Sequence, residues 1–183
     1  MRSVTPNKMN DIELLKSINL AKQSFGPPCS KYCGSLTTEF IRQALKDIGV
    51  QVSGRDVFIR GLPTEIDLII HKRGITAGNS LLYEPQDVLV TIEVKNAGSF
   101  GDKTIQSIRQ NSVAIKQANN KIRCCYLALS ERKGYKWAIS EANSGCESYT
   151  LFWHSGSGAN RVDQPTGDWS RFLRNMKQYQ EEA

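Results

Sequence analysis

The sequence predicts an α/β domain in which helices flank a central mixed β-sheet. In several segments apolar residues recur every three or four positions, and in other short segments apolar and polar residues alternate. Between residues 56 and 129 these segments follow one another in the order β-β-β-α-β. A helix inserted into a run of strands is typical of a mixed sheet covered by helices.

Four segments have the apolar spacing of amphipathic helices. The first is followed by Gly26 and two prolines, which are residues that end a helix. In the third, Ile105, Ile108 and Ile115 share one face. We expect helices over residues 9–25, 35–48, 103–118 and 168–180, with a loop between the first two.

Five other segments are rich in β-branched and aromatic residues, as strands are. We expect strands over residues 56–60, 64–70, 88–95, 122–129 and 149–153. A chain of 183 residues fits one domain. We therefore expect residues 1–183 to form a single unit with an N-terminal helix (9–25), a core over about 35–130, and a C-terminal strand and helix over 148–180.

Two of the expected strands carry acidic residues, at 64–70 and 88–95. Alternation places Glu93 and Lys95 on one face of the second strand. If the two strands pair as antiparallel neighbours in the register that sets Asp67 opposite Glu93, the two carboxylates lie close together. The same register places Ile70 opposite Val90 and Arg73 opposite Asp87, and it leaves residues 74–86 as the connection.

Carboxylates on directly opposed residues repel each other unless a cation joins them or one is protonated. Oxygen ligands of this kind suit Mg²⁺ or Mn²⁺. Such an ion stabilises charge on a phosphate and lowers the pKa of a water molecule. The ammonium of Lys95, on the same face as Glu93, would be placed to stabilise a phosphodiester transition state.

The order Asp67, then Glu93-Val94-Lys95 on the next strand, resembles the PD-(D/E)xK signature of restriction-endonuclease-like nucleases. The resemblance covers about residues 35–130 and implies the fold of that family, a central mixed sheet flanked by helices. It departs from the signature at Glu65, which precedes Ile66-Asp67 in place of a proline.

The resemblance also implies an activity and a set of roles. Asp67 and Glu93 would bind Mg²⁺ or Mn²⁺ together with the carbonyl of Val94. Glu39, on the helix before the first strand, would match a further acidic residue of the family. As a fourth catalytic residue it would hold a second metal ion or a metal-bound water. The implied enzyme is an endonuclease that hydrolyses DNA as a homodimer, because two strands have to be cut.

Charge and polar side chains favour the same partner. The net charge is +6, which favours a polyanion such as DNA. Basic residues flank the acidic strands, and the helix over 103–118 carries amides that the resemblance places near substrate. The candidate substrate contacts are Lys72, Arg73, Lys103, Gln106 and Gln110.

Other classes of function lack support in the sequence. No G-x-x-x-x-G-K-[ST] loop occurs, so we expect no nucleotide cofactor. No segment reaches the roughly 18 apolar residues that cross a bilayer, and the N-terminus has no signal-peptide core, so we expect a cytoplasmic protein with no membrane contact. The cysteines are odd in number and predict no disulfide framework: Cys29, Cys33, Cys124, Cys125 and Cys146.

Three alternatives stay open at this point. Asp67 and Glu93 could be solvated residues on the outer face of a half-exposed sheet. The chain could be a DNA-binding module with this fold and no catalysis. It could also act on RNA or serve as an interaction subunit of a larger complex.

Overall fold

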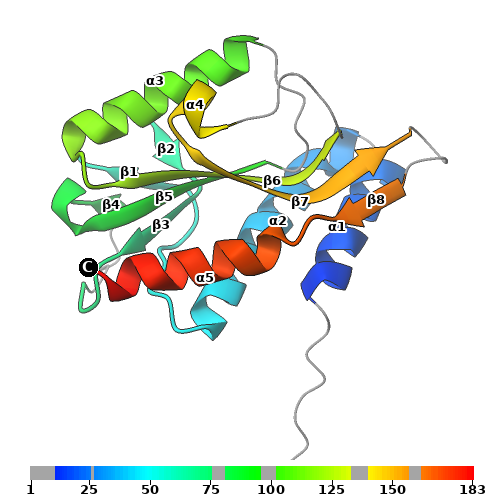
Figure 1. The fold of residues 1–183 in the computed structure, drawn as a ribbon, viewed down its shortest axis with the longest axis horizontal. Coiled ribbons are helices and arrows are strands. Elements are labelled where there is room, and N and C mark those ends of the chain that lie inside the picture. Colours follow the sequence, from blue (N-terminus) through cyan, green and yellow to red (C-terminus); the bar gives the residue numbers. More distant parts are fainter. Residues whose placement is uncertain (1–10, 26, 76–80, 96–101, 133–139, 157–161) are drawn as a thin grey trace, which may run out of the picture.

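The computed structural model describes residues 11–25, 27–75, 81–95, 102–132, 140–156 and 162–183. A five-stranded mixed sheet lies at its centre, with the strand order β3-β5-β6-β7-β8 (Figure 1). The strands β5, β6 and β7 run parallel, and the two edge strands are antiparallel to their neighbours. The bounds are β3 (Leu68–His71), β5 (Val88–Lys95), β6 (Arg123–Arg132), β7 (Glu147–Ser155) and β8 (Val162–Pro165).

A second, three-stranded sheet has the order β2-β1-β4. Its strands are β1 (Val57–Ile59), β2 (Glu65–Ile66) and β4 (Leu82–Tyr83), and the short 3-10 helix η1 (Pro85–Asp87) leads from it into β5. Residues Val57 and Ile59 are buried beneath α3 (Asp102–Ala118), together with Ile108 and Ile115 of that helix. The small sheet and α3 therefore enclose one apolar core on this face of the central sheet.

The opposite face of the central sheet is covered by α1 (Asp11–Phe25), α2 (Pro27–Asp47) and α5 (Asp168–Glu181) (Figure 1). Leu15, Ile41 and Phe172 from these helices are fully buried against the β5 residues Val90 and Ile92. A short helix, α4 (Glu141–Ser144), precedes β7 on the α3 side. None of the helices in the described ranges is long and apolar enough to cross a membrane.

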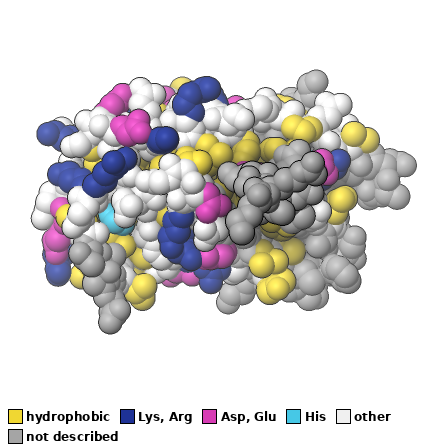
Figure 2. Space-filling view, turned by 90° about the horizontal axis from the view of Figure 1, so that it is seen from below, with side chains coloured by type: hydrophobic (Ala, Val, Ile, Leu, Met, Phe, Trp, Pro, Cys, Tyr) yellow, Lys and Arg dark blue, Asp and Glu magenta, His cyan; other side chains and the backbone are white. Residues whose placement is uncertain are grey.

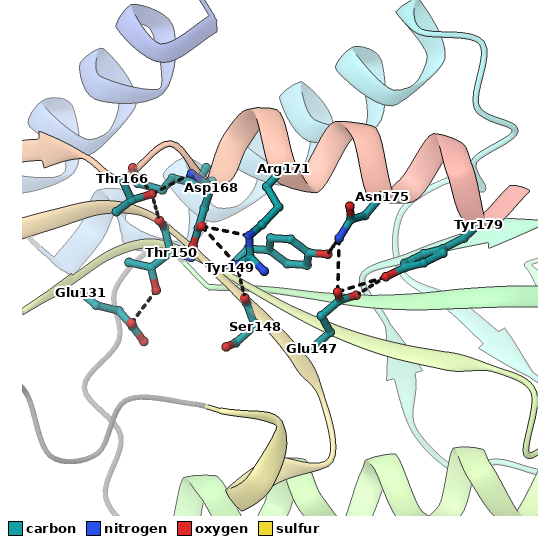
Figure 3. Close-up of polar contacts among 11 residues, drawn as sticks. Glu131, Glu147, Ser148, Tyr149, Thr150, Thr166, Asp168, Arg171, Asn175 and Tyr179 are labelled. Carbon is teal, nitrogen blue, oxygen red and sulfur yellow. Dashed lines mark hydrogen bonds and ion pairs between the residues drawn. The ribbon is translucent and has the colours of Figure 1, made fainter.

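A polar network fastens α5 along β7 (Figure 3). The carboxylate of Glu147 accepts hydrogen bonds from the Tyr179 hydroxyl at 2.9 and 3.0 Å and from Asn175 Nδ2 at 3.3 Å. Arg171 lies over the ring of Tyr149 and donates to the Ser148 carbonyl at 3.0 Å. These contacts satisfy polar groups at the seam between helix and sheet, where an unpaired one would be costly.

The predicted helices are confirmed, with one error of extent. The helix predicted to begin at residue 35 begins at Pro27, so the predicted loop between the first two helices is wrong. Proline is tolerated in the first turn of a helix, because the N–H it lacks would have no partner there. Helix α3 and helix α5 match their predicted ranges within one residue.

The strand predicted over 64–70 is divided at Asp67. Glu65–Ile66 belongs to the small sheet and Leu68–His71 to the central one, so Ile66 lies in a different core from Leu68 and Ile70. Strands β4 and β8 and helix α4 were not predicted, and β4 lies within the connection expected over residues 74–86. Segment 56–60 does form a strand, but in the small sheet rather than the central one.

The predicted register of the acidic strands is confirmed over most of its length. Ile70 pairs with Val90 and Leu68 with Ile92, which places Asp67 opposite Glu93. A bulge between Ile70 and His71 then shifts the register by one residue. In consequence Lys72, and not the predicted Arg73, lies beside Asp87, and its N–H donates to the Asp87 carbonyl at 3.0 Å.

Replacing Phe172 with alanine should lower the free energy of unfolding by about 3–5 kcal/mol, because the fully buried ring packs edge-on against Tyr149 and stacks on Trp169. The matched control is Phe58→Ala, whose side chain is 36% exposed, with an expected loss of about 1 kcal/mol or less. Urea denaturation measures both. Equal losses in the two variants would contradict the placement of α5 on the central sheet.

Candidate metal-dependent active site

Asp67 lies at the point where the chain leaves the small sheet and enters the central one. Its Oδ2 accepts a hydrogen bond from the backbone N–H of Val94 at 2.6 Å. Val94 stands between Glu93 and Lys95 on β5, so this bond joins the aspartate directly to the E-x-K segment. A charge-assisted bond of this kind is stronger than one between neutral groups and fixes the carboxylate in place.

The segment before β1 supports Asp67 from its other side. Ser53 donates its N–H to the Ile69 carbonyl at 2.8 Å, and its hydroxyl accepts from the Ile69 N–H at 2.9 Å. Asp56 donates its N–H to the carbonyl of Asp67 at 3.2 Å. Asp56 has φ 57°, a left-handed conformation that costs energy in any residue but glycine. Asp67 is thus held between β5 and a turn with a strained backbone.

The charges of the site act on one another. The pKa of Asp67 is raised from its ordinary value of 3.8 to about 6. Burial is the largest cause and the charge of Glu93 the next, while the Val94 N–H and Lys95 oppose the change. Lys95 forms an ion pair with Glu93. Burial acts to lower the pKa of Lys95, but the charge and hydrogen bond of Glu93 and the charge of Asp67 outweigh it, so the pKa is raised. Lys95 therefore stays cationic.

Three of the four predicted catalytic residues, Asp67, Glu93 and Lys95, come together in this way, and the Val94 backbone lies among them. Glu39 has different partners. Its carboxylate accepts hydrogen bonds from Arg42 at 2.5 and 2.9 Å, and Arg55 lies 3.7 Å away. The hydrogen bond from Arg42 lowers the pKa of Glu39.

Two of the predicted substrate contacts, Lys72 and Arg73, lie at a distance from this centre. Lys72 and Arg73 follow the far end of β3, roughly 16 Å along the strand from Asp67 at 3.3 Å per residue. Lys72 lines an open hollow of about 650 Å³ with Lys121 and Arg123. Figure 2 shows Lys and Arg side chains gathered toward this end of the molecule, at the left of the view. Exposed positions of α3 hold Lys103, Gln106 and Gln110.

Sequence reasoning missed two neighbours of the site. Tyr126 on β6 pairs with Glu93, and its pKa is raised by burial and by the charges of Glu131 and Glu93. Asp56, whose backbone contacts Asp67, lies within reach of its charge. No local signal in the sequence identifies either residue, because both approach the site only through strand pairing.

The chemistry of these donors fits a small divalent cation. The set contains oxygen only, two carboxylates and the Val94 carbonyl, which is the kind of set that Mg²⁺ and Mn²⁺ prefer. The mutual repulsion that raises the pKa of Asp67 is what a cation would relieve. In the part of the chain that the structure describes, no group of three or more His, Cys, Asp or Glu side chains is arranged to hold a metal.

Asp67→Asn should raise the free energy of unfolding at pH 8 by about 1–3 kcal/mol. The folded state raises the pKa of Asp67 from 3.8 to about 6, so stability falls as the pH rises through this interval. The cost of the ionised carboxylate is complete above about pH 6, and asparagine lacks it. The difference in the free energy of unfolding between the variant and the wild type should therefore disappear below pH 3.8. Urea denaturation at pH 8 and below pH 3.8 measures it.

Glu65→Gln is the matched control for this measurement, because it removes an exposed carboxylate two residues away. Its stability should follow that of the wild type at every pH. An Asp67→Asn variant that is less stable than the wild type at pH 8 would contradict the burial and repulsion assigned to Asp67.

No protein-family model matches the chain, and no curated protein matches it. Among solved structures it is similar to NucC of P. aeruginosa ATCC27853 in a cAAA-bound form, with a TM-score of 0.59 and 10% identity over 92% of this chain and 90% of that one. It is also similar to NucC of E. coli MS115-1. For its cAAA-bound form the TM-score is 0.54, with 10% identity over 96% of this chain and 93% of that one. For its apo form the TM-score is 0.53, with 9% identity over 91% of this chain and 89% of that one.

The similarity spans nearly the full length of both chains while few residues are identical. At this identity it establishes the fold alone. The NucC structures have a restriction-endonuclease-like fold. The predicted fold class, an α/β domain with a restriction-endonuclease-like mixed sheet flanked by helices, is confirmed.

Proposed function

We propose that this protein is a metal-dependent nuclease that hydrolyses phosphodiester bonds of DNA. Asp67, Glu93 and the carbonyl of Val94 would hold Mg²⁺, with Mn²⁺ as a substitute. Lys95 would contact the phosphate or the attacking water. The structural similarity to NucC supports a nuclease at the level of the fold, and the arrangement of the acidic strands supports the site.

One observation carries the proposal, the hydrogen bond from the Val94 N–H to Asp67 Oδ2. If Asp67 and Glu93 were unrelated surface residues, the aspartate would have no reason to be buried against the segment that contains the glutamate. Burying a carboxylate in that position is unfavourable without a compensating partner. A cation shared by the two carboxylates would be that partner.

Each group has a role that follows from its chemistry. A bound Mg²⁺ would supply Lewis-acid stabilisation of the phosphate and would lower the pKa of a water molecule. The Lys95 ammonium, kept protonated by Glu93 and Asp67, would stabilise negative charge that builds up on the phosphate oxygens. The backbone N–H of Val94 and the turn at Asp56 keep Asp67 oriented toward Glu93.

The wider surface would bind the DNA backbone. Lys72, Arg73 and Lys103 are exposed cations, and Gln106 and Gln110 are exposed amides on α3. Contacts of this kind position a duplex through its phosphates and make binding sensitive to salt. Cutting both strands of a duplex would require a second active site, so we also propose a homodimer.

Glu39 would act differently from the role first expected for it. Its ion pairs with Arg42 and Arg55 place it beside the turn at Asp56, which holds Asp67. We therefore propose that Glu39 supports the position of this turn. A ligand role for Glu39 would require these two arginines to release it.

Glu93→Gln should lower the rate of cleavage by at least about a hundredfold. It replaces an ionised ligand by a neutral amide of the same size. The measurement uses supercoiled plasmid, linear duplex and single-stranded DNA, with Mg²⁺, Mn²⁺ or EDTA. Glu13→Gln, which removes an exposed carboxylate on α1, should cleave at the wild-type rate. Cleavage by Glu93→Gln at the wild-type rate, or unchanged cleavage in EDTA, would remove the assignment.

Lys95→Met should separate binding of the metal from catalysis. Its affinity for Mn²⁺, measured by calorimetry, should equal or exceed that of the wild type, because the ammonium that pairs with Glu93 is gone. Its cleavage rate should fall by about 10²–10³, since the stabilising charge is lost. A variant that no longer binds Mn²⁺ would instead assign Lys95 to holding the carboxylates in place.

Binding of DNA without any binding of Mn²⁺ by the wild type would favour a non-catalytic DNA-binding module.

A further inference from the structure

Two buried cysteines lie side by side beneath α3. Cys125 pairs with Glu147 in the parallel ladder between β6 and β7, so the residues just before them, Cys124 and Cys146, are also cross-strand neighbours. Both belong to the core on the α3 side, and both are reduced thiols with 5% of their surface exposed. Neighbouring strands lie about 4.8 Å apart, which falls within the Cα separations that a disulfide spans.

The turn before β7 fixes the position of Cys146. Gly145 has φ 70°, and a Cβ at this position would lie 2.7 Å from the hydroxyl of Ser112 on α3. That hydroxyl donates to the Ser144 carbonyl at 2.7 Å, and the N–H of Cys146 donates to Ser144 Oγ at 3.1 Å. Because α3 holds this turn tightly, Cys146 stays beside Cys124.

The two thiols border a cavity that reaches the proposed active site. The cavity has a volume of about 30 Å³, and its lining includes Cys124, Cys146, Thr91 and Glu93. A space of this size admits a molecule about as large as water. The cysteines are thus accessible to a small polar reagent but not to a large one.

The surroundings make the two thiols unequal. The hydrogen bond between them lowers the pKa of Cys124 and raises the pKa of Cys146. Thr91 and the charge of Lys116 favour the thiolate of Cys124 further, against the effect of burial. A thiolate beside a protonated thiol is the arrangement in which one sulfur attacks an oxidant and the other resolves the product.

We propose that Cys124 and Cys146 form a reversible dithiol–disulfide site whose oxidant is hydrogen peroxide. The Cys124 sulfur attacks one peroxide oxygen, the O–O bond breaks, and a sulfenic acid and one water form. The Cys146 sulfur then displaces the hydroxyl group, giving the disulfide and a second water. The two sulfurs are oxidised, the peroxide is reduced, and the two thiol protons leave in the waters.

Oxidation would also affect the site at Glu93. A disulfide would join β6 to β7 covalently at the wall of the cavity that Glu93 also lines, two residues from Tyr126, the partner of Glu93 on β6. We therefore expect weaker binding of Mn²⁺ after oxidation. This second step rests on the proposed function, whereas formation of the disulfide does not.

Peptide mapping tests the disulfide. The full chain is treated with a small excess of hydrogen peroxide, the remaining thiols are alkylated, and the protein is digested with trypsin. The expected product joins residues 124–132 to residues 137–161, is lighter than the two peptides by about 2 Da, and is reversed by dithiothreitol. Peptide 124–132 also contains Cys125, so the linkage is assigned with variants.

The linked product should persist in Cys125→Ala and disappear in Cys124→Ala and Cys146→Ala. Cys125 is the matched control because it lies on the same strand but in the opposite core, beside Glu147. Circular dichroism of each variant identifies any that fail to fold, and Cys124→Ser then replaces Cys124→Ala. A wild-type chain that yields no linked peptide, or one that links Cys125, would overturn the proposal.

Calorimetry with Mn²⁺ tests the effect on the active site. The oxidised wild type should bind Mn²⁺ more weakly than the reduced protein, and Cys146→Ala should show no change on peroxide treatment. Equal affinities in the presence of the mapped disulfide would overturn the coupling to Glu93. If even the reduced protein fails to bind Mn²⁺ while the disulfide forms, the proposed function fails and the dithiol site stands.

Discussion

The geometry of the candidate active site depends on the hydrogen bond between the carboxylate of Asp67 and the backbone N–H of Val94. Asp67 lies where the chain passes from the small sheet to the central one, so the bond attaches this crossing point to β5. The bond compensates only part of the cost of burying the charge, and the pKa of Asp67 stays raised. The protein therefore retains an unfavourable carboxylate beside a second one, as active sites commonly do.

The rest of the fold supplies rigidity around this point. Apolar cores on both faces of the central sheet hold β5 in place. The polar contacts of Glu147 with Tyr179 and Asn175 anchor α5 to β7 (Figure 3). On the α3 side the packing is interrupted only slightly, by the small cavity that Glu93 shares with the two cysteines. A site built on strands is positioned more precisely than one built on loops, which suits chemistry that depends on short distances.

The sequence was sufficient for the fold class and for the convergence of Asp67, Glu93 and Lys95. Strand alternation has a period of two, so the register that sets Asp67 opposite Glu93 also pairs the buried residues Ile70 and Val90, as the structure confirms. The same pattern concealed the change of sheet at Asp67, because Ile66 and Leu68 are buried on either side of it. Arg42 is a neighbour of Glu39 on the same helix, three residues along, but Arg55 could not be foreseen as its second partner, since it reaches Glu39 only through tertiary packing.

A crystal structure with Mn²⁺ would locate the metal from its anomalous signal. We predict one strong peak about 2–2.4 Å from a carboxylate oxygen of both Asp67 and Glu93, with the Lys95 ammonium displaced from Glu93. A structure at saturating Mn²⁺ in which the Glu93–Lys95 ion pair is intact and no peak lies between the two carboxylates would contradict this prediction.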